Sequence, residues 1–377
     1  MSDALRYRSS GTTERENLSR MLSATEPGHL PLDVWLTEPA ADMIEAHTGS
    51  RDAVDALGIS LQRIYPNYAP NPAAWRNAYR KLGFEIHPDA LIGSMGTVDD
   101  VPPAHTVGAA YHLLEMRHPL GVVESVDQLE SLPWPDVDAP DGYRHVAVAV
   151  DRAHARGIAA IGDVCCTAFE SAWYLRGMDR LYLDLVDSTG IADWLLDWFT
   201  HRAEAAVAAF VRAGVDQIWL GDDVGTQRGL MMAVPFWQEH LKPRLRRVIE
   251  VVRNEQVEPV WIGYHSDGDI RPIIEDLIEI GIDILNPIQP ECMPVRQTIE
   301  TYKDRLAFWG MIGTQTTMPF GTPDDVRAAV GELRNLAEHG ARIVVSPTHV
   351  IEPDVPWENL EALVREVKKP LRQGVSP

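Results

Sequence analysis

The sequence Pro259-Val260-Trp261-Ile262-Gly263-Tyr264-His265-Ser266-Asp267-Gly268-Asp269 is an apolar run that ends in imidazole, hydroxyl and carboxylate side chains. The segment after it, residues 271–278, has apolar residues at helical spacing. Together they predict a buried strand, a polar tip and an amphipathic helix. In a barrel of parallel strands the C-terminal tips face the active site, so we expect His265 and Asp267 to perform chemistry.

The same alternation of apolar run and helical pattern recurs along the chain. Short continuous apolar runs separated by helices are typical of parallel strands that are buried on both faces. We therefore predict a single α/β domain, a (β/α)8 TIM barrel, with a doubly wound open sheet as the alternative. No Gly-x-Gly-x-x-Gly follows any run, so nothing supports a dinucleotide-binding fold. The eight predicted strands are 30–35, 59–65, 158–164, 215–220, 260–263, 282–285, 306–312 and 341–345.

Two stretches fall outside this alternation. Residues 1–12 are polar and lack apolar periodicity, so we expect a polar tail there and a barrel domain over residues 13–377. Residues 66–143 contain ten prolines, which leave little room for long regular elements. Their apolar clusters are short and scattered, so we expect an excursion within the barrel domain, between early strands.

The composition is that of a globular protein, with 45% hydrophobic and 24% charged residues. A formal net charge of −21 disfavours sequence-independent binding to nucleic acid or to an anionic membrane, because both favour lysine and arginine. No apolar run has transmembrane length and the first residues lack the apolar segment of a secretory signal, so we expect a cytoplasmic protein. The three cysteines include no CxxC pair, which excludes an all-cysteine zinc site. Nothing in the sequence indicates an oligomeric state.

Polar side chains gather at the predicted strand tips, where a barrel would hold its site. Strand-to-helix turns select Asp, Ser, Thr and Asn as helix caps whatever the function. We assign such roles to Asp269, Thr322 and Asp324. His265 and His349 are not explained in this way, because histidine is not a favoured cap. Other polar residues at the tips are Asp33, Asp163, Cys165, Cys166, Asp222, Asp223, Gln227, Asn286, Gln289, Thr314, Gln315 and Thr348.

Four motifs occur in order along the chain. They are Gly221-Asp222-Asp223-Val224-Gly225-Thr226-Gln227, the block 264–289 that ends Asp283-Ile284-Leu285-Asn286-Pro287-Ile288-Gln289, Pro319-Phe320-Gly321-Thr322-Pro323-Asp324-Asp325-Val326, and His349-Val350-Ile351-Glu352-Pro353 with Pro356-Trp357-Glu358-Asn359-Leu360. From about Arg15 to Leu371 the chain resembles the uroporphyrinogen decarboxylase superfamily, whose members are single-domain (β/α)8 barrels. That superfamily divides between porphyrinogen decarboxylases and enzymes that move methyl groups to or from a corrinoid (cobalamin-type) cofactor, including zinc-dependent thiol methyltransferases.

The porphyrinogen decarboxylases of this superfamily carry two arginines after the first strand, in the pattern Arg-Gln-Ala-Gly-Arg, which hold the propionates of the substrate. The matching stretch here is Val34-Trp35-Leu36-Thr37-Glu38-Pro39-Ala40-Ala41, which has no arginine. A polyanionic tetrapyrrole needs guanidinium groups to offset its charge. The family's Phe-Ser-Asp-Ile-Leu segment also has no clear counterpart. The resemblance therefore favours the methyltransferase branch over haem-pathway decarboxylation.

In the thiol methyltransferases the metal ligands follow a His-x-Cys pattern at a strand tip and a distant Cys. Here His265 is retained, Asp267 stands at the first Cys position, and His349 stands where the second Cys would be. The resemblance thus implies a metal site of these three residues, a set suited to Zn²⁺ or another divalent ion with a position left open for substrate. Without metal, the pair His265 and Asp267 could orient a loop, or a histidine could act as general acid or base.

The leading hypothesis is an enzyme that transfers a methyl group between a small methylated or methoxylated compound and a corrinoid, with a divalent metal as Lewis acid. Asp222 and Asp223 are adjacent, so only one of them can face the barrel axis and take part. The corrinoid would arrive on a separate carrier protein, because no Asp-x-His-x-x-Gly motif occurs here. Decarboxylation of a carboxylate substrate and a non-catalytic binding barrel are the alternatives. Candidate substrate contacts are Asp33, Gln227, Gln289 and Gln315.

Overall fold

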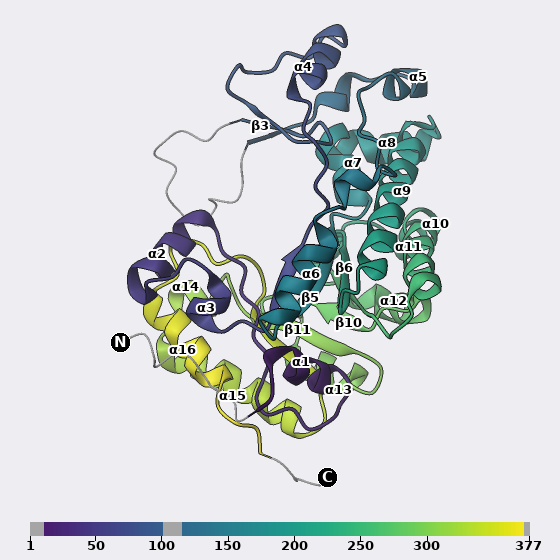
Figure 1. Ribbon diagram of the computed structural model, residues 1–377. Coiled ribbons are helices and arrows are strands. Elements are labelled where there is room, and N and C mark those ends of the chain that lie inside the picture. The colour runs from purple at the N-terminus through teal and green to yellow at the C-terminus, as the bar shows by residue number, and fades with distance from the viewer. Residues whose placement is uncertain (1–10, 101–114, 373–377) are drawn as a thin grey trace.

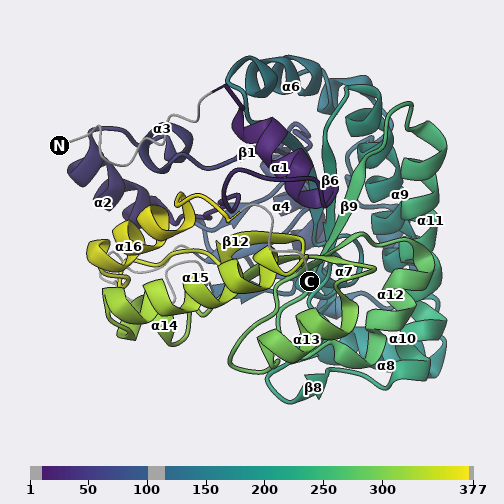
Figure 2. The ribbon, with the colours of Figure 1, turned by 90° about the horizontal axis from the view of Figure 1, so that it is seen from below.

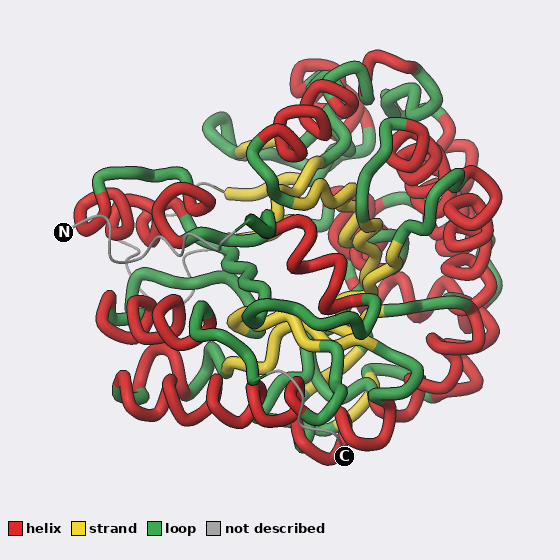
Figure 3. Tube along the Cα trace, turned by 60° about the horizontal axis from the view of Figure 1, so that its bottom comes forward, coloured by secondary structure: helices red, strands yellow, loops and turns green. Residues whose placement is uncertain are grey.

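Parallel strands form the centre of the molecule and helices surround them (Figure 3). The computed structural model describes residues 11–100 and 115–372, so most of the predicted polar tail lies outside the described residues. Seven strands form one parallel sheet that curls as a TIM barrel does, and they follow one another in chain order around it. The predicted barrel class is confirmed. The strands are β1 (Leu61–Ile64), β5 (Ala159–Cys165), β6 (Gln217–Gly221), β9 (Trp261–His265), β10 (Ile284–Asn286), β11 (Ala307–Ile312) and β12 (Ile343–Pro347).

The eighth strand position holds the first predicted strand, residues 30–35, in a reduced form. Leu32 forms an isolated parallel bridge with Val345 of β12. On the other side, the backbone amide of Ser60, just before β1, donates to the Leu32 carbonyl at 2.8 Å. Regular pairing with β12 stops because Pro347 has no N–H to continue the ladder. The segment therefore lies between β12 and β1 without becoming a full strand.

Helices follow the strands and pack around the outside of the barrel. They are amphipathic: α15, for example, buries Val326, Val330 and Leu333 and begins with a capping box in which Thr322 and Asp325 bond each other's backbone. Among the described residues, no helix combines the length and apolar character needed to span a membrane. Helix α6 (Val146–Ala155) precedes β5. The helices after β5 are α7 (Phe169–Arg176), α8 (Met178–Asp187), α9 (Ile191–Arg212), α10 (Val234–His240), α11 (Lys242–Glu255), η4 (Arg271–Ile273), α12 (Ile274–Ile280), α13 (Val295–Tyr302), α14 (Thr317–Phe320), α15 (Pro323–Glu338) and α16 (Trp357–Val367).

The end of the barrel at which the strands start is covered by α1 (Glu14–Leu22), seen beside β1 and β6 in Figure 2. Thr13 caps this helix through a capping box with Glu16. Leu18 and Leu22 of α1 are buried with the inward side chains of the strands, which include Leu61, Ile161, Trp219, Ile284, Trp309 and Val344. The barrel interior is therefore filled by packed side chains at this end, and the cavity lined by the strand tips lies at the opposite end.

The proline-rich stretch forms the elements between β1 and α6, seen at the top of Figure 1 around α4, β3 and α5. Its longest described element is α4, with 10 residues, so the prolines limit regular structure as predicted. Residues 101–114 of the excursion lie outside the described residues. The early part of the chain contains α2 (Glu38–Thr48), α3 (Ala53–Leu57), α4 (Pro72–Lys81), β2 (Leu91–Ile92), β3 (Val98–Asp100), β4 (Glu115–Arg117), η2 (Pro119–Val122), α5 (Val126–Glu130) and η3 (Pro140–Gly142).

Candidate active site

A cavity of about 730 Å³ lies at the C-terminal ends of the strands. Its size is in the range of small-molecule sites, and its position is where TIM-barrel enzymes bind their substrates. The residues that line it are Trp35, Tyr65, Asp163, Cys165, Cys166, Glu170, Trp173, Tyr174, Asp223, His265, Asp267, Gln289, Thr314, Gln315, Thr348, His349, Val350, Glu352, Asp354 and Val355.

The strand register brings four tips into line beneath this cavity. Cys165 pairs with Gly221, Gly221 with His265, and His265 with Asn286, across β5, β6, β9 and β10. Gly221 is required here because a side chain at this position would collide with the backbone oxygen of His265. Side chains that follow these tips along the chain therefore converge on a common volume.

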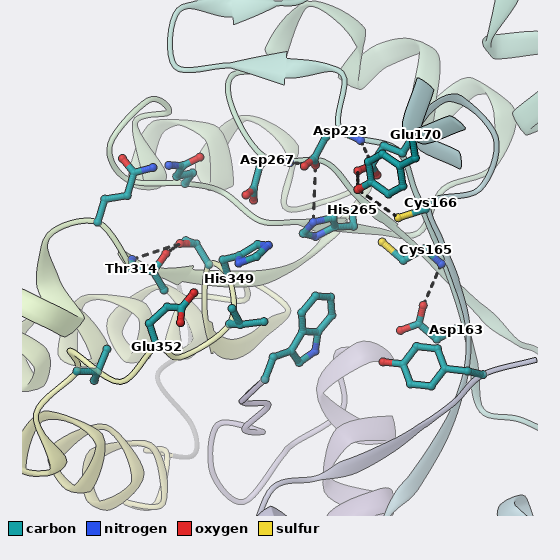
Figure 4. Close-up of a pocket in the computed structure, with 18 of the residues that line it drawn as sticks. Asp163, Cys165, Cys166, Glu170, Asp223, His265, Asp267, Thr314, His349 and Glu352 are labelled. Carbon is teal, nitrogen blue, oxygen red and sulfur yellow. Dashed lines mark hydrogen bonds and ion pairs between the residues drawn. The ribbon is translucent and has the colours of Figure 1, made fainter. Parts of the chain in front are cut away.

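Asp223, His265 and Asp267 form the central cluster, in which one ligand atom of each lies within 4.8 Å of the others. The backbone amide of Asp267 donates to Oδ1 of Asp223 at 2.7 Å, and His265 Nε2 lies 3.7 Å from the same oxygen. Figure 4 shows the two carboxylates beside the imidazole. Burial opposes the charge on His265, but Asp223 and Asp267 outweigh it and raise the pKa of the imidazole.

The two loops that carry the carboxylates pack directly against each other. The short strands β7 (Gly225–Thr226) and β8 (Gly229–Leu230) form a hairpin after β6. The backbone amide of Asp269, in the loop after β9, donates to the carbonyl of Thr226 in this hairpin at 2.8 Å. Gly268 adopts φ +84°, and a side chain there would strike the backbone of Gly225 and Thr226. These close approaches fix the distance between Asp223 and Asp267.

Asn286 determines which nitrogen of His265 faces the cavity. The Nδ2 group of Asn286 donates to the carbonyl of Trp309 at 3.0 Å, so its Oδ1 is turned toward Nδ1 of His265 and accepts a hydrogen bond from it. The proton is thus held on Nδ1, and Nε2 points toward the two carboxylates. This is the arrangement by which a backing residue orients a metal-binding histidine.

Glu170 on α7 is a further acid in the cavity wall. It accepts hydrogen bonds from the Tyr174 hydroxyl at 2.7 Å and from the Asp223 amide at 3.0 Å. Burial, together with the nearby carboxylates of Asp223 and Asp222, raises the pKa of Glu170 to about 8. The side chain can therefore hold a proton near neutral pH while it lies beside the cluster.

The pair Asp222 and Asp223 is divided as the alternation of a strand predicts. Asp223 lines the cavity, whereas Asp222 turns outward and accepts from the amides of Ala168 and Glu170 at the start of α7. Burial raises the pKa of Asp222 to about 6, although these amides oppose the rise. Asp222 therefore caps the helix that carries Glu170.

Arg63 occupies the barrel interior below the cavity. Its guanidinium bonds Asp163 at 2.8 Å and Asp33 at 2.9 Å, and it lies 4.2 Å from the ring centre of Trp35 and 4.3 Å from that of Trp219. The predicted substrate contact Asp33 thus has its carboxylate turned to Arg63, and it is not among the residues that line the cavity. Its Oδ2 also accepts from Trp309 Nε1 at 3.1 Å.

The remaining predicted residues divide between the cavity and the surface. His349 lines the cavity, with its ring centre 6.5 Å from that of His265, but it is not part of the close cluster. Gln289 and Gln315 line the cavity, and Gln289 also accepts from the Gly268 amide at 3.1 Å. Gln227 is exposed on the β7–β8 hairpin and does not line the cavity. The structure therefore groups His265 and Asp267 with Asp223 rather than with His349.

The donor set of Asp223, His265 and Asp267 fits a divalent metal ion. One imidazole nitrogen and two carboxylates are ligands that Zn²⁺, Mn²⁺ and Fe²⁺ accept, and the cavity leaves room for substrate. This close group contains one histidine and two acids, whereas the set predicted from the sequence, His265, Asp267 and His349, contains two histidines and one acid and stays a prediction. Because carboxylates are harder ligands than thiolates, this set does not favour the thiolate-rich zinc of the thiol methyltransferases.

Several residues of the site were not singled out from the sequence. Glu170 has no signal because it lies within a helix, and it reaches the cavity only because Cys166, with φ +59°, turns the chain directly after β5. Asn286 was noted as a polar tip without a role. Trp35 stands in the stretch that lacks arginine, and no pattern in that stretch indicates that its ring lines a cavity. Their positions depend on strand register, which a single sequence does not give.

A barrel of parallel strands with an acid and imidazole cluster at the C-terminal ends defines a TIM-barrel protein with an enzyme-like site. The chain belongs to the uroporphyrinogen decarboxylase family, because the family model described as Uroporphyrinogen decarboxylase (URO-D) matches residues 98–370. This match confirms the superfamily that the sequence motifs indicated.

Solved structures give a similar result for the fold. The chain resembles a methyltransferase from Methanosarcina mazei with 19% identity and a TM-score of 0.59, over 94% of this chain and 98% of that chain. A B12-independent methionine synthase from Shewanella sp. W3-18-1 matches less well, with 13% identity and a TM-score of 0.40, over 59% of this chain and 65% of that chain. A search of curated proteins finds no match.

Proposed function

We propose that this protein is a metal-dependent methyltransferase that moves a methyl group between a small methylated or methoxylated compound and a corrinoid carried by a separate protein. The observation that carries the proposal is the cluster of Asp223, His265 and Asp267 in a cavity at the strand tips. Family membership and the fold shared with a methyltransferase are consistent with it.

Asp223, His265 and Asp267 would hold the metal, with His265 binding through Nε2. When bound there, a divalent ion supplies Lewis acidity, which makes the heteroatom of a methyl donor a better leaving group. Asn286 keeps Nε2 available by accepting a hydrogen bond from the Nδ1–H group of His265. Asp223 and Asp267 come from two neighbouring loops that pack on each other, and His265 is the last residue of β9, so the cluster is preorganised.

Glu170 would manage the proton of the reaction. Burial is the largest cause of its raised pKa and persists when a metal offsets the charge of Asp223, so the carboxyl can give a proton to the departing oxygen or sulfur, or take one from an acceptor in the reverse direction. The Tyr174 hydroxyl donates to it at 2.7 Å and orients the carboxyl group. Its bond to the amide of Asp223 keeps it beside the cluster.

The cavity argues against a porphyrinogen substrate. None of the described residues that line it is lysine or arginine, while six are aspartate or glutamate. A substrate with several carboxylates would meet uncompensated like charge there, because Arg63 is already bonded to two carboxylates. Decarboxylation of a porphyrinogen is therefore disfavoured by both the sequence and the cavity.

A separate protein would carry the corrinoid. A cavity of about 730 Å³ suits a compound of drug size, so a whole corrinoid could only approach its opening. The small substrate would lie inside against the cluster, and the reactive face of the corrinoid would close the cavity from outside.

The first test is metal content and methyl transfer. We expect purified protein to contain about one divalent metal per chain by elemental analysis, and to form or consume a methylated corrinoid in an absorbance assay with methoxylated compounds. His265→Ala should lose the metal and the transfer together, because it removes the one nitrogen ligand. His349→Ala is the matched control, since it removes an imidazole from the same cavity and should retain the metal.

Two results would contradict the proposal. If His349→Ala loses the metal and His265→Ala keeps it, the ligand set is wrong. If metal-loaded protein releases carbon dioxide from a carboxylated substrate and never changes the corrinoid spectrum, the reaction is a decarboxylation.

A further inference from the structure

The charge of the cavity is strongly one-sided. Its lining, within the part of the chain that the structure describes, contains six carboxylates and no lysine or arginine. Asp163 is matched by Arg63 at 2.8 Å. Asp223 and Asp267 belong to the central cluster, where a divalent ion would offset them. Glu170 lies beside that cluster, and the last two acids of the lining, Glu352 and Asp354, lie outside it.

These two acids belong to the loop after β12, across the cavity from the loops after β6 and β9. Figure 4 shows Glu352 on the far side of His349 from Asp223. Glu352 is buried, with 8% of its surface exposed, whereas Asp354 is exposed at the rim. The cavity therefore has a metal-binding end and a separate acidic end.

Aromatic side chains also line the cavity, and Trp35 lies between its two ends, with its ring centre 5.7 Å from that of His265 and 6.4 Å from that of His349. Trp35, Tyr65, Trp173 and Tyr174 all line the cavity, and Tyr65 keeps 56% of its surface exposed. The negative faces of aromatic rings attract cations, including those that cannot donate a hydrogen bond. Trp35 already makes this interaction with the Arg63 guanidinium, which lies 4.2 Å from the centre of its ring.

We propose that the substrate of this site carries a fixed positive charge, such as a methylated ammonium group, which is held at the acidic end of the cavity beside Trp35. The methylated oxygen or sulfur of the same compound faces Asp223, His265 and Asp267. This inference rests on the proposed function for the transfer itself, in which the O–CH₃ bond breaks, the methyl group passes to the reduced corrinoid and the oxygen keeps the bonding pair and takes a proton. The inference adds the chemical class that the cavity selects.

Binding can be measured without turnover. The probe is choline, which has a quaternary ammonium group and a hydroxyl group, and its neutral isostere is 3,3-dimethylbutan-1-ol, in which carbon replaces nitrogen. Isothermal titration calorimetry on zinc-loaded protein should give choline an affinity at least roughly tenfold higher than the isostere. Raising the salt concentration should weaken choline binding and leave the isostere unchanged.

Variants assign the effect to the acidic end. Asp354→Asn and Glu352→Gln should each lower choline affinity by roughly threefold to tenfold without changing that of the isostere. Asp354 is exposed, so its substitution should not affect folding. Glu250→Gln on α11, an exposed acid that does not line the cavity, is the matched control and should bind choline as the parent does.

Equal binding of choline and its isostere, or an unchanged choline affinity in both acid variants, would overturn the inference. This result is distinguishable from failure of the proposed function. Selective choline binding without any change in a corrinoid would leave the cationic cavity standing and remove the methyl transfer. Methyl transfer from neutral methoxylated compounds, with no preference for choline in binding, would support the proposed function and overturn the cationic substrate.

Discussion

Replacement of Arg63 by methionine should destabilise the barrel more than the loss of a surface arginine does. The guanidinium bonds Asp33 and Asp163, and the side chains of all three residues are at most 8% exposed. Burial alone disfavours the charge of Arg63, but the two carboxylates outweigh it and raise its pKa. Methionine keeps the apolar volume and removes the charge, so two carboxylates would be left without their partner in the barrel.

The expected cost follows from this geometry. Breaking a buried ion pair by removing one partner costs about 3–5 kcal/mol, because the remaining charge is uncompensated. The ring contacts to Trp35 and Trp219 each add about 0.5–2 kcal/mol, which is not additive with the ion pairs. We expect Arg63→Met to lower the free energy of unfolding by about 4 kcal/mol in urea denaturation followed by tryptophan fluorescence.

Two further variants serve as controls for this measurement. Arg246→Met removes a guanidinium that is 45% exposed and paired with Glu279, and it should cost less than about 1 kcal/mol. A triple variant that adds Asp33→Asn and Asp163→Asn should regain part of the loss, because the buried charges are removed with their partner. Two results would contradict this reasoning: Arg63→Met lowers the free energy of unfolding no more than Arg246→Met does, or the triple variant is less stable than Arg63→Met alone. Either result would mean that the ion pairs of Arg63 do not stabilise the barrel below the cavity.

Three other outcomes are expected. Glu14 bonds Lys368 at 3.1 Å, and although burial opposes its charge, a hydrogen bond from a histidine and the Lys368 ammonium lower its pKa from 4.5 to about 2. Its contribution of about 3 kcal/mol should be present above pH 4.5 and lost between pH 4.5 and 2, so the stability difference between the parent and Glu14→Gln should shrink over that window in acid titrations. Glu170→Gln should make the metal-free protein more stable above pH 8, since a carboxyl whose pKa is raised in the folded state costs stability as the pH rises. The same variant should slow methyl transfer, and an unchanged rate would show that Glu170 does not transfer the proton. Asn286→Leu should weaken zinc binding by roughly 10-fold to 100-fold in competition with a chelator while the fold is retained, and an unchanged affinity would mean that Asn286 does not orient His265.

The barrel could be predicted because its strands are buried on both faces. A run such as 306–312 is apolar throughout and ends at the same residue as β11 (Ala307–Ile312). The first strand is the least regular, since it is linked to β12 by one isolated bridge, from Leu32 to Val345, and Pro347 interrupts the ladder. Backbone pairing of this kind depends on the partner strand, which apolar periodicity in one segment does not report.

The ion pairs of Arg63 with Asp33 and Asp163, below the cavity, could not be predicted for a different reason. Arg63 lies 30 residues from Asp33 and 100 from Asp163, and each residue alone is compatible with a solvent-exposed end of a strand. Only the closed barrel brings the three inward at one level. The pattern of polar strand tips therefore places Asp33 near the site, without indicating that its carboxylate is bonded to an arginine below the cavity.

The composition of the central cluster follows from the order of strands in the sheet. β6 and β9 are neighbours, with Gly221 opposite His265, so the residues just past their tips can meet within hydrogen-bonding distance, as Asp223 and Asp267 do at 2.7 Å. β12 is separated from β9 by β10 and β11, and His349 after it reaches the same cavity with its ring centre 6.5 Å from that of His265. A compact ligand set in a barrel should therefore be sought first on adjacent strands, and residues from more distant strands should be expected on the wall that faces the substrate. By this argument we expect Asp223 to be the third ligand of the proposed metal and His349 to face the substrate, which is why the two histidine variants are expected to differ in metal content.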